Sequence, residues 1–165
     1  MTKIKRKWAD RFMGLAHHIA QWSADPSTKV GAVVVGPDHE LRSTGYNDLP
    51  RGVKSTPRRW ERPLKLSTVV HAECNAIDNA ARVGVPLKGC TMYIDGLLPC
   101  AVCAGHIIQA GITVIVVRDK TMPERWAESM REGVKMMMES GVEIVCMKPK
   151  SRRKAPKKRK VAKKK

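Results

Sequence analysis

Aromatic residues are scarce in this chain of 165 residues, which contains one Phe, two Tyr and four Trp. Proteins that bind single-stranded nucleic acid usually stack bases on aromatic side chains, so this composition argues against a polynucleotide ligand. No stretch approaches the roughly 20 apolar residues of a membrane span, and the basic, polar N-terminus lacks the apolar core of a signal peptide. We therefore expect one soluble, cytoplasmic domain.

Disulfides are not expected either. The chain has five cysteines, an odd number, and two of them stand in a metal-binding pattern described below. Cysteines used in this way fit a reducing compartment better than a disulfide framework.

Acidic residues are absent from the C-terminal segment 148–165, which holds 12 of the 32 Lys and Arg. The remaining body has 20 basic and 15 acidic residues, so most of the net charge of +17 belongs to this tail. Self-repelling charge with few apolar side chains predicts disorder. We expect a folded domain over 1–147 and a tail that contacts nucleic acid nonspecifically. Residues 156–161 also resemble a nuclear import signal, which would make the location nuclear.

Apolar residues alternate between helical spacing and short β-branched runs, which predicts alternating helices and strands. The expected helices span residues 8–22, 71–82, 100–110 and 124–140, and the expected strands span 30–35, 41–46, 91–94, 112–117 and 142–146. Residues 47–66 read as one long basic loop. A loop of that length is usually functional or mobile.

The most informative pattern is His71-Ala-Glu73 followed by Pro99-Cys-Ala-Val-Cys103. His71 and the two cysteines of this pattern, Cys100 and Cys103, would supply three zinc ligands at the N-termini of two expected helices. Zinc prefers four ligands, and a fourth position held by water is typical of a catalytic site. The pattern is typical of zinc nucleobase deaminases, in which zinc activates water and a glutamate that is not a ligand transfers protons. Glu73 has the position of that glutamate.

A structural zinc site is the alternative reading. It would need a fourth Cys or His, and the remaining cysteines and histidines form no second ligand pair. Cys74 directly follows Glu73, so we expect its side chain to point away from the site. These considerations favour catalytic zinc, one ion per subunit, over a structural or degenerate site.

Several segments together resemble the deoxycytidylate (dCMP) deaminase family of the cytidine deaminase-like superfamily. They are His71–Ile77, Trp22–Val35, Gly45–Gly52 and Pro99–Ile112, and the resemblance runs from about Trp8 to Val117. It implies a three-layer α/β/α fold with a five-stranded mixed sheet. It also implies hydrolysis of dCMP to dUMP and ammonia, and commonly a homo-oligomer, often a hexamer.

The resemblance also assigns roles to single residues. It makes His71, Cys100 and Cys103 the zinc ligands and Glu73 the proton shuttle. It places Asn47 at the nucleoside sugar and the backbone N–H of Ala72 at the pyrimidine carbonyl, and it associates Arg82 with the nucleotide phosphate or its regulation. Asn47 could instead be a turn residue, and Arg82 could form a surface salt bridge.

Asp48 departs from the family, which has glycine at the end of its Gly-Tyr-Asn-Gly turn. That turn binds a regulatory triphosphate in allosterically controlled members. A carboxylate beside a triphosphate is repelled unless Mg²⁺ bridges the two, so we expect Mg²⁺ here only together with a regulatory nucleotide.

Three functions were weighed: hydrolytic deamination of dCMP, deamination of cytosine or adenosine in single-stranded nucleic acid, and noncatalytic binding by a zinc-stabilised protein. The concentration of charge in the tail and the few aromatic residues favour the first over the second. Glu73 beside an open zinc position argues against the third, since a binding protein has no use for a proton shuttle.

Overall fold

The sheet has five strands and both parallel and antiparallel pairs. The computed structural model describes residues 4–118 and 120–147. The strands are β1 (Gly31–Val35), β2 (Leu41–Tyr46), β3 (Thr91–Asp95), β4 (Val114–Val117) and β5 (Glu143–Cys146). Their order is β2-β1-β3-β4-β5. Strands β2, β1 and β3 pair antiparallel, whereas β3, β4 and β5 pair parallel.

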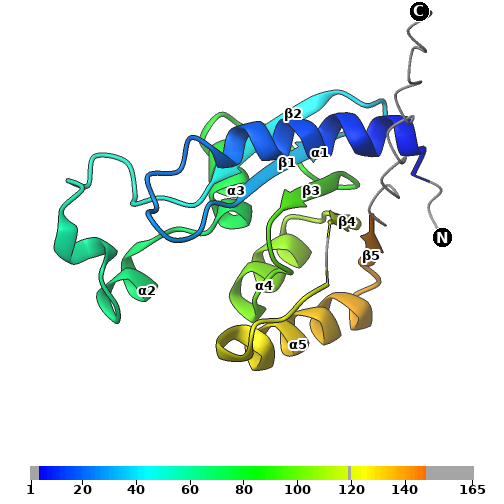
Figure 1. Ribbon diagram of the computed structural model, residues 1–165. Coiled ribbons are helices and arrows are strands. Elements are labelled where there is room, and N and C mark those ends of the chain that lie inside the picture. Colours follow the sequence, from blue (N-terminus) through cyan, green and yellow to red (C-terminus); the bar gives the residue numbers. More distant parts are fainter. Residues whose placement is uncertain (1–3, 119, 148–165) are drawn as a thin grey trace, which may run out of the picture.

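Helices cover both faces of the sheet (Figure 1). They are α1 (Arg6–Ala20), α2 (Leu64–Thr68), α3 (Ala72–Arg82), α4 (Ala101–Gln109) and α5 (Glu124–Glu139). Helix α1 packs on the face that carries Val33, Val35 and Tyr93. Helices α3, α4 and α5 pack on the opposite face, around Val34 and Met92. Alternate residues of β1 thus enter opposite cores, and the expected three-layer α/β/α fold is confirmed.

Gly45 lets α3 lie directly against β2. A Cβ at this position would overlap the backbone of Ala72 and Ala76, so only glycine permits the observed distance between helix and strand. The hydroxyl of Ser43 also donates a hydrogen bond to the carbonyl of Ala76, at 2.6 Å. These contacts fix the position of the N-terminus of α3, where the sequence places Ala72 and Glu73.

The expected boundaries hold to within about two residues for most elements, but the prediction for 47–66 as one loop was wrong. This region contains a 3-10 helix, Pro57–Trp60, and the start of α2 at Leu64. Both elements are too short to show an apolar period, and prolines precede or open them. The backbone of Asp48 also pairs with that of Val70, which ties the region to the segment before α3.

The tail 148–165 lies outside the described residues, so its disorder and its import signal stay predictions. Within 4–118 and 120–147, every helix is too short or too polar to cross a bilayer.

Candidate metal centre and nucleotide cavity

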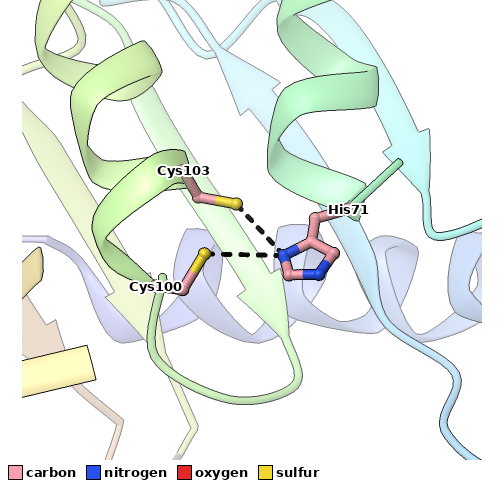
Figure 2. A group of neighbouring side chains, drawn as sticks. All are labelled: His71, Cys100 and Cys103. Carbon is pink, nitrogen blue, oxygen red and sulfur yellow. Dashed lines mark hydrogen bonds between the residues drawn. The ribbon is translucent and has the colours of Figure 1, made fainter. Parts of the chain in front are cut away.

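Two helix N-termini bring the predicted ligands together, as the sequence analysis expected. His71 is the N-cap of α3 and Cys100 is the N-cap of α4, with Cys103 in the first turn of α4. Figure 2 shows the three side chains turned toward one another. The Nδ1 atom of His71 lies 3.6 Å from the Sγ of Cys100 and 3.3 Å from the Sγ of Cys103.

This donor group fits a zinc ion. Its three ligand atoms all lie within 4.8 Å of one another, and both cysteines are buried. Tetrahedral zinc with Zn–S and Zn–N bonds of about 2.3 and 2.1 Å places sulfur and nitrogen about 3.6 Å apart. The two N–S distances are close to that value. One imidazole with two thiolates is also a donor set that zinc favours.

The pKa values of the three groups are strongly shifted. A hydrogen bond from the Cys103 thiol, assisted by His71 and opposed by burial, lowers the pKa of Cys100 to about 4. The hydrogen bond to Cys100 raises the pKa of His71 to about 9, although burial opposes it. Cys103 has a raised pKa because its thiol donates to Cys100. These shifts make Cys100 the most acidic of the three groups, and metal binding to such a group releases protons.

The prediction that Cys74 points away from the site was wrong. Its Sγ lies 3.7 Å from the Sγ of Cys103. Cys74 is three residues after His71, and positions three apart on a helix share one face. Among the described residues, however, the group able to hold a metal comprises only His71, Cys100 and Cys103.

Glu73 lies in the first turn of α3, beside the metal-binding group, and its side chain is 5% exposed. Burial raises the pKa of this carboxyl above its usual range, because the charged form loses its solvation. A buried carboxyl beside a metal-binding group is well placed to take part in proton transfer. Ala72, the first residue of α3, is fully buried. The first N–H groups of a helix have no partner within the helix and can bind a ligand oxygen.

A cavity of about 110 Å³ opens from the metal-binding group. Its wall includes His71, Cys100, Glu73, Ala72 and Asn47, so five of the seven predicted residues meet there. Arg82 does not line this cavity. It is exposed at the opposite end of α3, ten residues and therefore about 15 Å along the helix from Ala72. The structure thus separates Arg82 from the other predicted site residues.

An open hollow of about 370 Å³ continues from the cavity toward solvent. The two share four lining residues, Thr28, Arg62, Lys65 and Arg125. Arg62 precedes α2 and Arg125 lies in the first turn of α5. Neither guanidinium group forms a hydrogen bond or an ion pair within the described part of the chain. Two exposed, unpaired guanidinium groups therefore border the mouth of the cavity.

The sequence analysis missed several residues of the cavity wall. Trp126 lies in the helix expected over 124–140 and was given no role in the site, yet it lines the cavity with its ring centroid 6.1 Å from that of His71. Arg125 directly precedes Trp126, and no sequence pattern indicated that it lines the cavity. Lys65 read as part of a basic loop, yet it is buried against Asp25, 40 positions away.

Helix α5 packs closely on the loop that carries Cys100. A Cβ at Gly133 would lie 2.8 Å from the carbonyl oxygen of Pro99 and 3.0 Å from the carbonyl carbon of Cys100. Ser129, one turn earlier, accepts a hydrogen bond from the Ala101 N–H at 3.1 Å. This contact positions the first turn of α4.

Gly133→Ala should therefore destabilise the zinc-loaded protein by about 1–3 kcal/mol, because the methyl group pushes α5 away from backbone atoms. Gly14→Ala is the matched control, since a Cβ there meets nothing within 4 Å on the exposed side of α1. It should stabilise by about 0.5–1 kcal/mol. Urea unfolding of both variants measures the difference, and equal stabilisation by both would contradict the close packing.

Comparison with known proteins agrees with this geometry. A model of the cytidine and deoxycytidylate deaminase zinc-binding region matches residues 6–118. The chain is 38% identical over 140 residues to an uncharacterized deaminase in the luxG 3′ region of Aliivibrio fischeri, covering 84% of this chain and 92% of that protein. It is 44% identical over 121 residues to deoxycytidylate deaminase of Mus musculus, covering 69% of this chain and 66% of the mouse protein. The match thus spans just under two thirds of the mouse protein.

A similar structure is also known. The dCMP deaminase of cyanophage S-TIM5, in complex with dCMP and dUMP, matches with a TM-score of 0.72 and 26% identity. The alignment covers 87% of this chain and 99% of the phage chain.

Proposed function

Because this chain belongs to the cytidine and deoxycytidylate deaminase family, we propose that it hydrolyses dCMP to dUMP and ammonia. The observation that carries the proposal is the joined cavity. A zinc-type donor group and a buried glutamate lie at its inner end, and unpaired arginines lie at its mouth. A nucleotide carries its reactive base at one end and its phosphate at the other. Its chemistry therefore matches both ends of this cavity.

At the inner end, we propose that His71, Cys100 and Cys103 hold zinc. The ion, when bound, supplies the Lewis acidity that makes hydroxide available at neutral pH. Glu73 is the proton carrier: its buried carboxylate accepts one proton of the attacking water and delivers it to the ring nitrogen, and it then accepts the second proton of that water and delivers it to the leaving amine. The N–H of Ala72 donates to the pyrimidine carbonyl and orients the base.

At the mouth, we propose that Arg62 and Arg125 bind the 5′-phosphate. Both guanidinium groups border the hollow, and each can form two parallel hydrogen bonds to phosphate oxygens. This replaces the assignment of Arg82, which is too far along α3 to reach a nucleotide in the cavity. The sugar then lies between the two ends, beside Asn47.

Arg62→Ala and Arg125→Ala should each lower kcat/KM for dCMP by about 10- to 150-fold, the value of one charge-assisted contact. Deoxycytidine, which has no phosphate, should be a poor substrate and should be nearly unaffected by either change. Arg82→Ala is the matched control and should leave both substrates unchanged. Ammonia release measures the activity of the wild type and of each variant on both substrates. Equal efficiency of the wild type on dCMP and deoxycytidine would contradict phosphate recognition, and a selective loss at Arg82 would restore the first assignment.

Other predictions of the sequence analysis extend beyond this site. A homo-oligomer, a regulatory nucleotide with Mg²⁺ and a cytoplasmic location stay predictions. The Asp48 side chain does have a local role, since one carboxylate oxygen accepts the Leu49 N–H at 2.7 Å and the other accepts the Ala24 N–H at 3.4 Å.

A further inference from the structure

A buried ion pair stands in the cavity wall. The Nζ of Lys65 lies 2.6 Å from Oδ1 of Asp25, and the two side chains are 9% and 2% exposed. The same ammonium donates to the hydroxyl of Ser27 at 2.6 Å. Removing two charges from water is costly, so a buried ion pair is weak evidence for stability and calls for another explanation.

The Asp25 carboxylate remains ionised in this setting. Burial by itself would raise the pKa of Asp25, but hydrogen bonds from Lys65 and from the backbone N–H groups of Ser27 and Thr28 lower it below its usual value. Those donors use the Oδ1 atom. The other oxygen, Oδ2, accepts a hydrogen bond from the amide of Asn47 at 3.0 Å.

Both hydrogens of the Asn47 amide nitrogen are used in hydrogen bonds. Its Nδ2 donates one hydrogen to Asp25 and the other to the carbonyl of Thr28, at 2.9 Å. Its Oδ1 accepts the N–H of Val30 at 2.7 Å, which leaves one lone pair. The amide orientation is unambiguous, because the Val30 N–H can only donate and the Thr28 carbonyl can only accept.

Because Asn47 lines the cavity, the remaining lone pair of its amide oxygen can accept a hydrogen bond from a ligand. Asn47 is 6% exposed and lines the cavity together with Asp25. Thr28 and Lys65 line both the cavity and the hollow, so this wall lies between the metal-binding group and the arginines. A nucleotide with its base at one end and its phosphate at the other presents its sugar here. The sugar of dCMP has a single hydroxyl, on C3′.

We propose that Lys65 is a positioning residue that acts through Asp25 to hold Asn47 so that its amide oxygen, a hydrogen-bond acceptor, is the only group it offers to a ligand, and that the site thereby selects a sugar with a free 3′-hydroxyl. The inference rests on the proposed function. A hydroxyl can donate to the second lone pair of Asn47 Oδ1, whereas a 3′-deoxy sugar leaves that lone pair without a donor. A 3′-phosphate has no hydrogen to donate and adds bulk. Internal nucleotides of a strand are esterified at this position, so the same device excludes polynucleotides.

The test compares three nucleotides with one base and one 5′-phosphate: dCMP, 2′,3′-dideoxycytidine 5′-monophosphate and deoxycytidine 3′,5′-bisphosphate. We expect the wild type to prefer dCMP over each analogue by about 5- to 150-fold in kcat/KM, because each analogue leaves a buried acceptor site without its donor. In Lys65→Met the Asp25 carboxylate loses its cationic partner, so it no longer holds the 25–28 turn and the Asn47 side chain firmly in place. The preference should then fall to within about threefold of unity, with KM for dCMP raised and zinc content unchanged. Lys54→Met, on the exposed basic segment, should behave as the wild type.

A second variant keeps the test decisive if Lys65→Met does not fold, because an unpaired buried charge is strongly destabilising. Asp25→Asn/Lys65→Met removes both charges. The amide oxygen introduced at position 25 would cap Ser27 and Thr28, which turns the new NH₂ group toward the NH₂ of Asn47. The two donors repel, so this variant should fold, keep zinc and lose the preference for dCMP.

The possible failures are distinct. Equal turnover of dCMP and the dideoxy nucleotide by the wild type would overturn the inference and leave the proposed function standing. Retention of the full preference by a folded Lys65→Met or by the double variant would also overturn it. Efficient turnover of the bisphosphate would overturn it in favour of a strand substrate. If zinc-loaded wild type deaminates none of the three, the proposed function fails, and the inference fails with it.

Discussion

Glu73→Ala should lower kcat for dCMP by about 10⁴-fold or more while the protein keeps its zinc. General acid–base catalysis typically contributes about 10²- to 10⁴-fold, and this one carboxyl serves several proton transfers in the proposed reaction. Its burial and raised pKa suit that task. Zinc should stay bound because Glu73 is not a member of the metal-binding group found in the described residues.

Two further variants separate proton transfer from packing. Glu73→Gln preserves the shape of the side chain and its ability to hydrogen-bond, but it cannot carry a proton, so it should lose as much activity as Glu73→Ala. Asp78→Ala removes an exposed carboxylate from the same helix and should have no effect. Single-turnover rates and zinc per chain are the measurements. Activity of Glu73→Gln within about tenfold of the wild type would exclude the proton-transfer role.

Cys100→Ser and Cys103→Ser should each lower zinc affinity by at least about 100-fold and abolish turnover. A hydroxyl is a harder and much poorer ligand than a thiolate, and three protein ligands leave no substitute. Cys146→Ser removes a thiol outside the group and should retain one zinc per chain. Zinc per chain after dialysis against a weak chelator measures the effect.

Cys74→Ser is the informative neighbour in this series, because its sulfur touches that of Cys103 without belonging to the group. It should keep its zinc. Loss of zinc from Cys74→Ser would make Cys74 a fourth ligand and the site structural. Full zinc in both Cys100→Ser and Cys103→Ser would refute the ligand assignment.

The sequence could predict the metal centre because its determinants are local. His71 and Glu73 are two residues apart, and Cys100 and Cys103 lie within one helical turn, so spacing alone predicts which side chains converge. The strands were predictable for a similar reason, since β1 and β4 are continuous apolar runs that only a doubly covered sheet buries. Cys74 was misplaced because its direction was judged from Glu73 rather than from His71, with which it shares a helix face.

The outer part of the site could not be predicted in this way. Lys65 meets Asp25 across 40 positions, and Arg62 and Arg125 come together only because α2 and α5 border the same opening. No local period records such contacts. A basic residue in a loop has the same sequence signature whether it is solvated, binds phosphate or forms a buried ion pair.

Helix α5 contacts both ends of the cavity. Arg125 stands at the mouth, Trp126 faces His71, and Gly133 lies against Cys100 about 12 Å further along the helix axis. One rigid helix thus carries both the arginine proposed to bind the phosphate and the surface against which Cys100 rests. The proposed phosphate contact and the packing behind the metal ligands therefore belong to a single element, and a nucleoside, which lacks the phosphate, engages only one end of it.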